Sequence, residues 1–291
     1  MKYLAELAPL EREQFYAFLN RQRKEQISTP KETVSKVLKL NKELFNVIKN
    51  KANISYSIEE LRNATWEYFL KEEAKFNASI LKQLSSQFEI PKQALSEVIS
   101  KLDLTASREN VVGQIENIFG EYAGRISPYI YNLSLSNTQS RRSRAGKVFE
   151  GIIYSLYERF DYPYASQATL GSKNFTQKGL GKIVDSLLPN LEAFQQRRDK
   201  VIIGTMKTTL RERWQEVIEE INRTSLPQIY LLTVDDNISE QKINQMANHN
   251  VILVVYERVK KLNPLLSKRN VISFEDYFLS EIPEKLNYWN S

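Results

Sequence analysis

The sequence of 291 residues contains no cysteine and 1 histidine, His249. Without cysteine the chain can form no disulfide, thiolate nucleophile or cysteine-bound zinc site. A single histidine nearly excludes histidine-based general-base catalysis and histidine-rich metal sites. If the chain is an enzyme, its chemistry therefore has to rest on carboxylates, lysine and an oxygen-bound metal ion such as Mg²⁺.

Long apolar runs are also missing. No run approaches the ~20 residues that a membrane-spanning helix needs, and the first residues lack the apolar segment of a signal peptide. We therefore expect an intracellular protein with no membrane partner. The 41 lysines and arginines outnumber the 35 acidic residues, giving a net charge of +6. This surplus is compatible with a nucleic-acid partner but specifies none.

Residues 1–125 contain few strand-like runs and are predicted to be helical. Apolar residues at spacings of three and four predict a helix over 31–50. Ser57 and Glu60 have the spacing of a capping box, which predicts that a long helix starts there. Two more helices are expected over 91–102, with Pro91 in the first turn, and over 107–121.

After Ser127-Pro128 the pattern changes to alternating strands and helices. Continuous runs rich in valine and isoleucine predict strands over 183–188, 200–207, 228–234 and 251–256. Helices are predicted over 143–160, 210–222, 240–248 and 274–279. Such runs between helices indicate an α/β fold whose central sheet is covered on both faces. We therefore predict a helical region over 1–125 and an α/β domain over 126–291.

Acidic residues and one lysine occur near the ends of the predicted strands. Asp185 lies in the 183–188 run and Lys207 ends the next strand, so the two can meet if these strands pair. Glu220, on the following helix, can reach the same point if that helix packs back along the sheet. Glu216 lies one turn earlier on the same helix face, so spacing alone does not decide between the two glutamates. Glu150, in the 143–160 helix, is a further candidate.

Two or three carboxylates with a lysine are what metal-dependent hydrolysis of a phosphodiester requires. The carboxylates hold one or two Mg²⁺ ions, and the lysine stabilises the charge that develops on the phosphate. Acidic residues and lysines are common, however, and near strand ends they more often form solvated ion pairs.

Three charged residues follow Lys207 at the predicted start of a helix: Arg211, Glu212 and Arg213. The helix dipole disfavours two arginines at that end, which suggests another reason for them. Arginine can bond guanine O6 and N7, and glutamate can accept from cytosine N4, so the set could recognise G·C pairs in a major groove. The alternative is a surface cluster of mutually paired charges.

Two other sets have a pattern typical of DNA contacts. The first is basic and suits phosphates, although a solvated turn is equally compatible; it consists of Arg141, Arg142, Arg144 and Lys147. The second is Arg62 with Trp66, four residues apart on one helix face. Trp66 could stack on a base, although such a tryptophan more often packs half-buried.

In order and spacing, three blocks of the chain resemble a known family. They are Arg141 to Glu150 (RRSRAGKVFE), Gly179 to Asp185 (GLGKIVD) and Lys207 to Thr224, which begins KTTLRERWQE. They look like the Type II restriction endonucleases of the SsoII, PspGI and EcoRII group, which cut at CCNGG or CCWGG. The similarity covers about residues 140–225, and the block from Lys207 to Trp214 is its most specific part.

The resemblance implies a PD-(D/E)XK nuclease fold, a homodimer and Mg²⁺-dependent cleavage of double-stranded DNA in a prokaryotic cytoplasm. It implies that Asp185 and Glu220 bind the metal, Lys207 is the catalytic lysine and Glu150 is an additional acid. A methyltransferase would act on the same site without binding this chain.

The same resemblance assigns the DNA contacts. Arg211, Glu212 and Arg213 match the residues that recognise the two G·C pairs of each half-site. Arg62 and Trp66 have the spacing of the pair that holds a flipped central base in some members. The helical region is also long enough to contact base pairs outside a CCNGG core.

The chain departs from the family motif at two positions. Val184 replaces the proline of the PD element, and Thr205 replaces the acid of the (D/E)XK element, so Glu220 has to supply the missing carboxylate. Two other functions stay open: a DNA-binding protein without catalysis, and a structure-selective or repair nuclease on the same fold.

Overall fold

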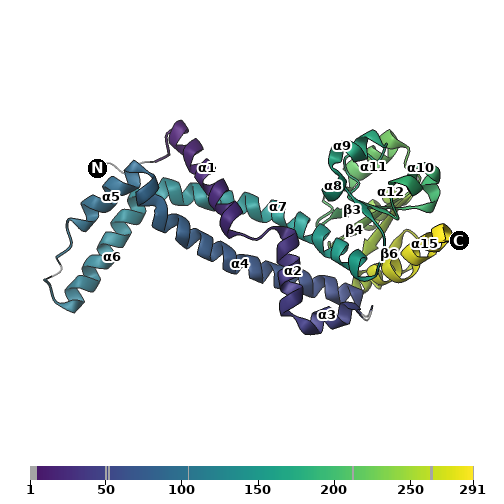
Figure 1. The fold of residues 1–291 in the computed structure, drawn as a ribbon, viewed down its shortest axis with the longest axis horizontal. Coiled ribbons are helices and arrows are strands. Elements are labelled where there is room, and N and C mark those ends of the chain that lie inside the picture. The colour runs from purple at the N-terminus through teal and green to yellow at the C-terminus, as the bar shows by residue number, and fades with distance from the viewer. Residues whose placement is uncertain are drawn as a thin grey trace. The chain divides into compact units, whose positions relative to one another are not determined.

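We analysed a computed structural model of the chain, which describes residues 5–49, 51, 53–103, 105–211, 213–262 and 265–290. The chain packs into two compact units. The helical unit comprises Met1–Thr29 and Trp66–Arg144, and the sheet unit comprises Pro30–Thr65 and Ala145–Ser291. Helices α4 (Ile54–Gln87) and α7 (Ser127–Arg159) contribute residues to both units (Figure 1).

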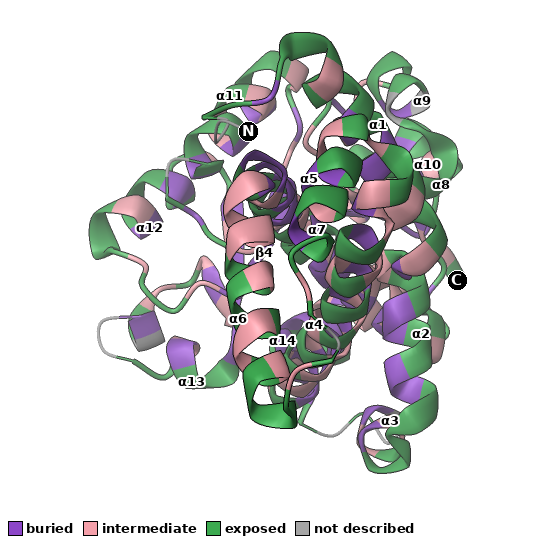
Figure 2. Cartoon of the chain, turned by 90° about the vertical axis from the view of Figure 1, so that its left-hand side faces the viewer, coloured by how far each residue is buried: buried purple, intermediate pink, exposed green. Residues whose placement is uncertain are grey.

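The helical unit is built around aromatic side chains. Besides its parts of α4 and α7, it contains α1 (Pro9–Gln26), α5 (Glu89–Ile99) and α6 (Arg108–Arg125). Phe15 packs edge-on against Tyr129, with ring centroids 5.1 Å apart, and Phe69 and Phe76 belong to the same buried cluster. By contrast, α6, all of whose residues are described, has no buried residue (Figure 2).

The sheet unit has a mixed sheet of six strands, in the order β1-β2-β3-β4-β5-β6. The strands are β1 (Ala165–Ser166), β2 (Ser186–Leu188), β3 (Ile202–Lys207), β4 (Ile229–Thr233), β5 (Val251–Val255) and β6 (Val271–Ser273). β1, β2 and β3 pair antiparallel, and β3 to β6 pair parallel. Every residue of β4 is buried, so the sheet is covered on both faces, as the continuous apolar runs predict.

The sheet unit also contains helices, some of which connect the parallel strands (Figure 1). They are α2 (Pro30–Leu40), α3 (Lys42–Lys49), α8 (Gln167–Leu170), α9 (Ser172–Gln177), α10 (Leu191–Gln196), α11 (Arg213–Thr224), α12 (Glu240–Ala247), α13 (Glu257–Lys260), α14 (Phe274–Asp276) and α15 (Ile282–Asn290). Short 3₁₀ turns occupy Arg198–Lys200 and Leu265–Ser267, and a π-helical turn spans Tyr277–Glu281. α11 joins β3 to β4 and buries Trp214, Val217 and Ile221, whose spacing makes it amphipathic.

Several predicted helix boundaries are wrong. The helix expected over 31–50 is two helices, because Asn41 interrupts it and its side chain accepts a bond from the Leu44 N–H. The capping box at Ser57 does not form: α4 begins at Ile54, and the Ser57 hydroxyl donates to the Asn53 carbonyl. The helix expected from Ser143 begins at Ser127. The helix expected from Leu210 begins at Arg213. The last helix, predicted over 274–279, does not end there: α14 is followed directly by the π-helical turn at Tyr277–Glu281 and then by α15.

Candidate active site

Asp185 lies immediately before β2, at the point where β2 pairs with β3. Its N–H donates to the Gly204 carbonyl at 2.9 Å. Its carboxylate Oδ2 accepts from the Met206 N–H at 2.6 Å and from the Thr205 hydroxyl at 3.3 Å. β3 thus holds Asp185 through both its backbone and its side chain, and the two strands whose pairing would let Asp185 and Lys207 meet are paired.

Lys207 is the last residue of β3. Side chains two apart on a strand share a face, so Lys207 lies on the same face as Thr205. The Lys207 charge lowers the pKa of both Asp185 and Glu150, so its ammonium lies within electrostatic range of the two carboxylates. The threonine that replaces the motif acid therefore serves as a hydrogen-bond donor to Asp185.

Glu150 reaches the same place from α7. Burial, and then the neighbouring charge of Asp185, raise the pKa of Glu150 to about 7, against its ordinary 4.5. Burial also raises the pKa of Asp185, although Lys207 and the bonds from Met206 and Thr205 act in the opposite direction. Glu150, Asp185 and Lys207 therefore lie within electrostatic range of one another, and we call these three residues the acid–lysine cluster.

The donor set of this cluster suits a divalent cation. A nearby positive charge favours the ionised form of two carboxyl groups whose pKa burial raises, and Mg²⁺ is commonly held by one or two carboxylates together with phosphate oxygens. In the part of the chain that the structure describes, no third acid or histidine joins them to complete a metal-binding group.

Glu220 points inward but does not join the cluster. Its Oε1 accepts from the Lys182 N–H at 2.9 Å, and its carboxylate pairs with Arg223. Its charge is not among those that shift the pKa of Asp185 or Glu150. A Cβ on Gly181, where φ is +79°, would lie 1.8 Å from this carboxylate. Glu220 thus packs against the turn that leads into Asp185, whereas Glu216 is exposed.

The predicted base-recognition residues lie just after β3. Arg211 is in the turn before α11, with φ +28°, and Arg213 is the first residue of that helix. Both are exposed, and neither guanidinium has an ion-pair or hydrogen-bond partner among the residues that the structure describes. The Leu210 N–H donates to Asp235 at 2.8 Å, which ties the turn to the residues after β4. Glu212 lies outside the described residues.

Arg62 and Trp66, both on α4, have different surroundings. Arg62, in the sheet unit, donates to the Tyr256 hydroxyl at 3.0 Å. Trp66, in the helical unit, is 40% exposed. The Arg141 guanidinium carbon lies 5.9 Å from the centre of its ring.

The four predicted phosphate-contact residues also differ from one another. Arg142 and Lys147 are exposed. Arg141 is partly exposed but pairs with Glu73, which is 2% exposed. Arg144 is buried: its guanidinium donates to the Ser28 carbonyl and packs over the Phe69 ring. In this conformation Arg144 contributes to the packing of the helical unit.

Two residues of the site gave no signal in the sequence. Tyr154 donates from its hydroxyl to the Asp185 carbonyl at 2.9 Å, and Asp235 accepts from Leu210. Tyr154 lies four residues after Glu150, a spacing that places both on one helix face. Once Glu150 was a candidate, that spacing could have indicated Tyr154; nothing comparable marks Asp235.

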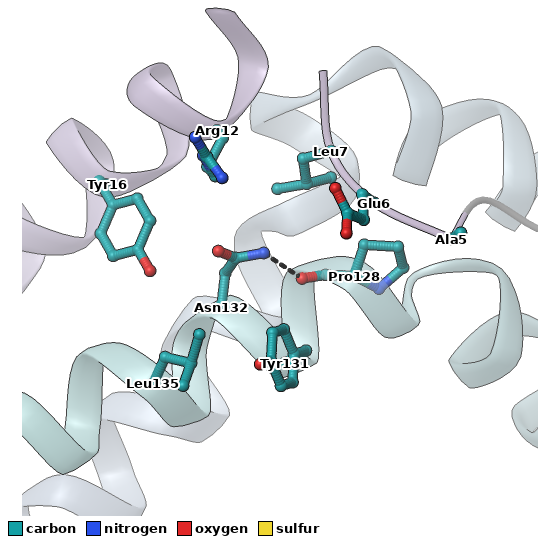
Figure 3. A pocket seen from close by; sticks show the side chains of 9 residues that line it. All are labelled: Ala5, Glu6, Leu7, Arg12, Tyr16, Pro128, Tyr131, Asn132 and Leu135. Carbon is teal, nitrogen blue, oxygen red and sulfur yellow. Dashed lines mark hydrogen bonds between the residues drawn. The ribbon is translucent and has the colours of Figure 1, made fainter. Parts of the chain in front are cut away.

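A pocket of about 610 Å³ lies elsewhere, in the helical unit, between the start of α1 and α7 (Figure 3). Polar and aromatic side chains line it, among them Arg12, Tyr16 and Asn132, whose amide donates to the Pro128 carbonyl. None of the predicted site residues borders it, so we do not connect it with the acid–lysine cluster.

Within the described residues, no helix is both long and apolar enough to span a membrane.

Comparison with known proteins gives a consistent set of relatives. Residues 105–278 match the family described as EcoRII C terminal. The Type II restriction enzyme SsoII of Shigella sonnei is 34% identical over 226 residues, which are 77% of this chain and 73% of that enzyme. Metal-depleted Ecl18kI in complex with uncleaved, modified DNA superposes with a TM-score of 0.76 at 30% identity, covering 96% of this chain and 86% of that one. The PspGI–substrate DNA complex, at 17% identity and TM-score 0.59 over 90% of this chain and 94% of that one, shares the fold.

Proposed function

This chain belongs to the EcoRII C-terminal family of Type II restriction endonucleases, and on that premise we propose that it cleaves double-stranded DNA at a palindromic CCNGG-like sequence with Mg²⁺ as cofactor. It is a site-specific deoxyribonuclease with the PD-(D/E)XK fold. Its relatives Ecl18kI and PspGI have been solved in complex with DNA, which supports double-stranded DNA as the substrate.

The acid–lysine cluster is the observation that carries this proposal. Asp185 would bind the cation, with Glu150 as the additional acid beside it. When bound, Mg²⁺ would supply Lewis-acid stabilisation and a more acidic water molecule. Lys207 would stabilise the negative charge that develops on the phosphate as water attacks in line. The products would be a 5′-phosphate and a 3′-hydroxyl.

Glu220 is proposed as the second metal ligand. Its carboxylate would have to leave the Lys182 N–H and Arg223, to which it is bonded. Arg223 has a side chain that is 56% exposed, so it is accessible to a DNA phosphate that could draw it away from Glu220.

Arg211, Glu212 and Arg213 are proposed to recognise the G·C pairs of each half-site. Support comes from the two arginines, whose guanidinium groups are exposed and unpaired among the described residues. An unpaired guanidinium presents two parallel donors that match guanine O6 and N7. Arg142 and Lys147, which are exposed, are the best placed of the basic set for phosphates, and Arg141 is partly accessible.

Trp66, with Arg62 one turn earlier on α4, is proposed to receive a flipped central base. The exposed part of the Trp66 ring supports this, because stacking on an aromatic ring is how flipped bases are held. A 2-aminopurine at the central position would become fluorescent on binding to the protein, and unchanged fluorescence would count against flipping. Base pairs outside the CCNGG core could be contacted by the helical region.

A palindromic site has two equivalent halves, so the active protein is proposed to be a homodimer in a prokaryotic cytoplasm. A methyltransferase would modify the same DNA site without binding this chain. Sedimentation should give twice the chain mass of 33.9 kDa, whereas a monomer at micromolar concentration would contradict the dimer.

Comparison of the wild type with Lys207→Ala tests the proposed chemistry. With Mg²⁺, the wild type should cut plasmid DNA into discrete fragments and the variant should cut none. Both should bind a specific duplex with similar affinity in EDTA, because Lys207 serves the phosphate in the transition state. Loss of binding together with cleavage would contradict this role.

A wild type that binds a specific sequence but never cuts would indicate a DNA-binding protein instead, and cutting only at junctions or mismatches would indicate a structure-selective nuclease.

A further inference from the structure

Tyr154 connects the two elements that carry the acids of the cluster. It lies one helical turn after Glu150 on α7, so the two side chains project from one face of that helix. Its hydroxyl donates to the backbone carbonyl of Asp185 at 2.9 Å. A single side chain thus links the helix that carries Glu150 to the segment that carries Asp185.

The backbone of Asp185 is held from several directions. Its carbonyl accepts from the Gln167 N–H at 3.0 Å as well as from Tyr154, and its N–H donates to Gly204. The bonds to Gly204, in β3, and to Gln167, which directly follows β1, fix Asp185 relative to these two strands. The bond to Tyr154 fixes it relative to α7, and therefore relative to Glu150.

The Tyr154 ring is itself held in place. It stacks on the ring of Tyr164, with centroids 5.4 Å apart and planes 12° from parallel. Burial raises the pKa of the Tyr154 hydroxyl far above its ordinary value of 10.0. The hydroxyl therefore stays protonated, and remains a donor, at neutral and moderately alkaline pH.

We propose that Tyr154 is a positioning residue that sets the separation of the Glu150 and Asp185 carboxylates and thereby the affinity of the site for a divalent cation. The inference rests on the proposed function, because it takes these two carboxylates to be the acids of the active site. Mg²⁺ demands a nearly ideal ligand geometry. Loss of a residue that orients metal ligands typically weakens metal binding ~10–100-fold.

The test is Tyr154→Phe, which removes the hydroxyl and keeps the stacked ring. Mn²⁺ binding to the DNA-free protein, measured by titration calorimetry, should weaken ~10–100-fold. At low Mg²⁺ the cleavage rate should fall, and it should recover toward that of the wild type as Mg²⁺ is raised. The affinity for a specific duplex in EDTA should not change, because Tyr154 would contact no DNA.

Tyr164→Phe is the matched control. In the wild type the Tyr164 hydroxyl donates to Glu158 at 3.0 Å and not to Asp185. The variant loses this hydroxyl and keeps the ring that stacks on Tyr154. Its Mn²⁺ affinity and Mg²⁺ dependence should equal those of the wild type. Thermal unfolding of both variants shows whether they are equally folded.

The outcomes separate the two proposals. If Tyr154→Phe matches Tyr164→Phe in Mn²⁺ affinity and Mg²⁺ dependence, while the wild type cleaves DNA, only the role of Tyr154 is overturned. Weaker DNA binding with unchanged Mn²⁺ affinity would overturn it as well. A wild type that does not cleave DNA with Mg²⁺ would overturn the proposed function itself.

Discussion

At the scale of single residues, Glu150 and Asp185 are two carboxylates that the fold buries beside each other. Burial is the largest cause of the raised pKa of both, and the proximity of Asp185 adds to the effect on Glu150. In the metal-free protein the ionised pair opposes folding, and a bound cation would remove that penalty.

Glu150→Gln should stabilise the metal-free protein in a pH-dependent way. A carboxyl whose folded-state pKa is raised holds its proton more tightly when folded, so wild-type stability falls as pH rises from about 4.5 to about 7. Glutamine does not titrate. The free energy of unfolding of Glu150→Gln should therefore equal that of the wild type near pH 4.5 and exceed it above pH 7, by roughly 2–3 kcal/mol. Urea unfolding in EDTA at several pH values measures this difference.

The same variant should lose activity, because it lacks one acid of the cluster. Mg²⁺ should stabilise the wild type more than Glu150→Gln, since binding to the folded state alone adds stability that grows with the logarithm of the affinity. A difference in free energy of unfolding between Glu150→Gln and the wild type that is the same at pH 5 and pH 8 would show that Glu150 does not titrate in this range.

Arg211 supports a prediction about specificity. Arg211→Ala should lose discrimination at one G·C position, costing ~1–3 kcal/mol for a bidentate contact. Arg142→Ala, at an exposed position proposed to contact phosphate, is the contrast: it should weaken binding to all sequences alike and lower the salt slope by about 1. Competition binding against duplexes with single substitutions measures both effects, and unchanged site preference in Arg211→Ala would contradict the assignment.

At the scale of elements, β3, the following turn and α11 have separate tasks within about 20 residues. β3 carries Lys207 and the donors that hold Asp185, the turn presents Arg211, and α11 directs Glu220 back to the turn at Gly181. Asp235 anchors the turn from the end of β4. The placement of this one segment therefore determines both the proposed chemistry and the proposed base recognition.

Glu220 and Glu216 provide a matched pair on α11. Glu220→Ala should reduce cleavage by orders of magnitude if the carboxylate moves to the metal, whereas Glu216→Ala, at an exposed position, should cleave like the wild type. Mn²⁺ affinity in the presence of specific DNA should fall only for Glu220→Ala. Equal activity of the two variants would mean that Glu220 supports the turn and binds no metal.

At the scale of the whole molecule, the strands were largely predictable from the sequence. The runs at 200–207, 228–234 and 251–256 form β3, β4 and β5, because a buried strand needs a continuous apolar run that few other elements show. The same pattern raised the possibility that the strand of Lys207 pairs with the run at 183–188, and β2 and β3 do pair. β1 and β6 were missed because strands of two and three residues carry too short a signal.

The helix boundaries were less predictable. The Ser55 N–H and hydroxyl both donate to the carboxylate of Glu275, which lies 220 residues later in the sequence. This contact accompanies the start of α4 at Ile54, before the expected start at Ser57. Packing groups residues 1–29 with 66–144 and residues 30–65 with 145–291, and the division of the chain at residue 125 stays a prediction.

The arrangement of the acids was only partly predictable. Spacing allowed Asp185 and Lys207 to meet if their strands paired and offered Glu150 as a further candidate, and in the structure the charge of Lys207 acts on both acids. It could not show that the Glu220 carboxylate is bonded to Lys182 and Arg223, because that depends on the conformation of the turn at Gly181.

Sequencing the ends of plasmid DNA digested by the wild-type protein tests whether the acid–lysine cluster carries out sequence-specific, Mg²⁺-dependent cleavage. We predict that every end derives from one palindromic sequence with a CCNGG-like core, that the ends carry 5′-phosphates, and that no ends appear without Mg²⁺ or with Lys207→Ala. Ends scattered over unrelated sequences, or the same ends from Lys207→Ala, would contradict the account.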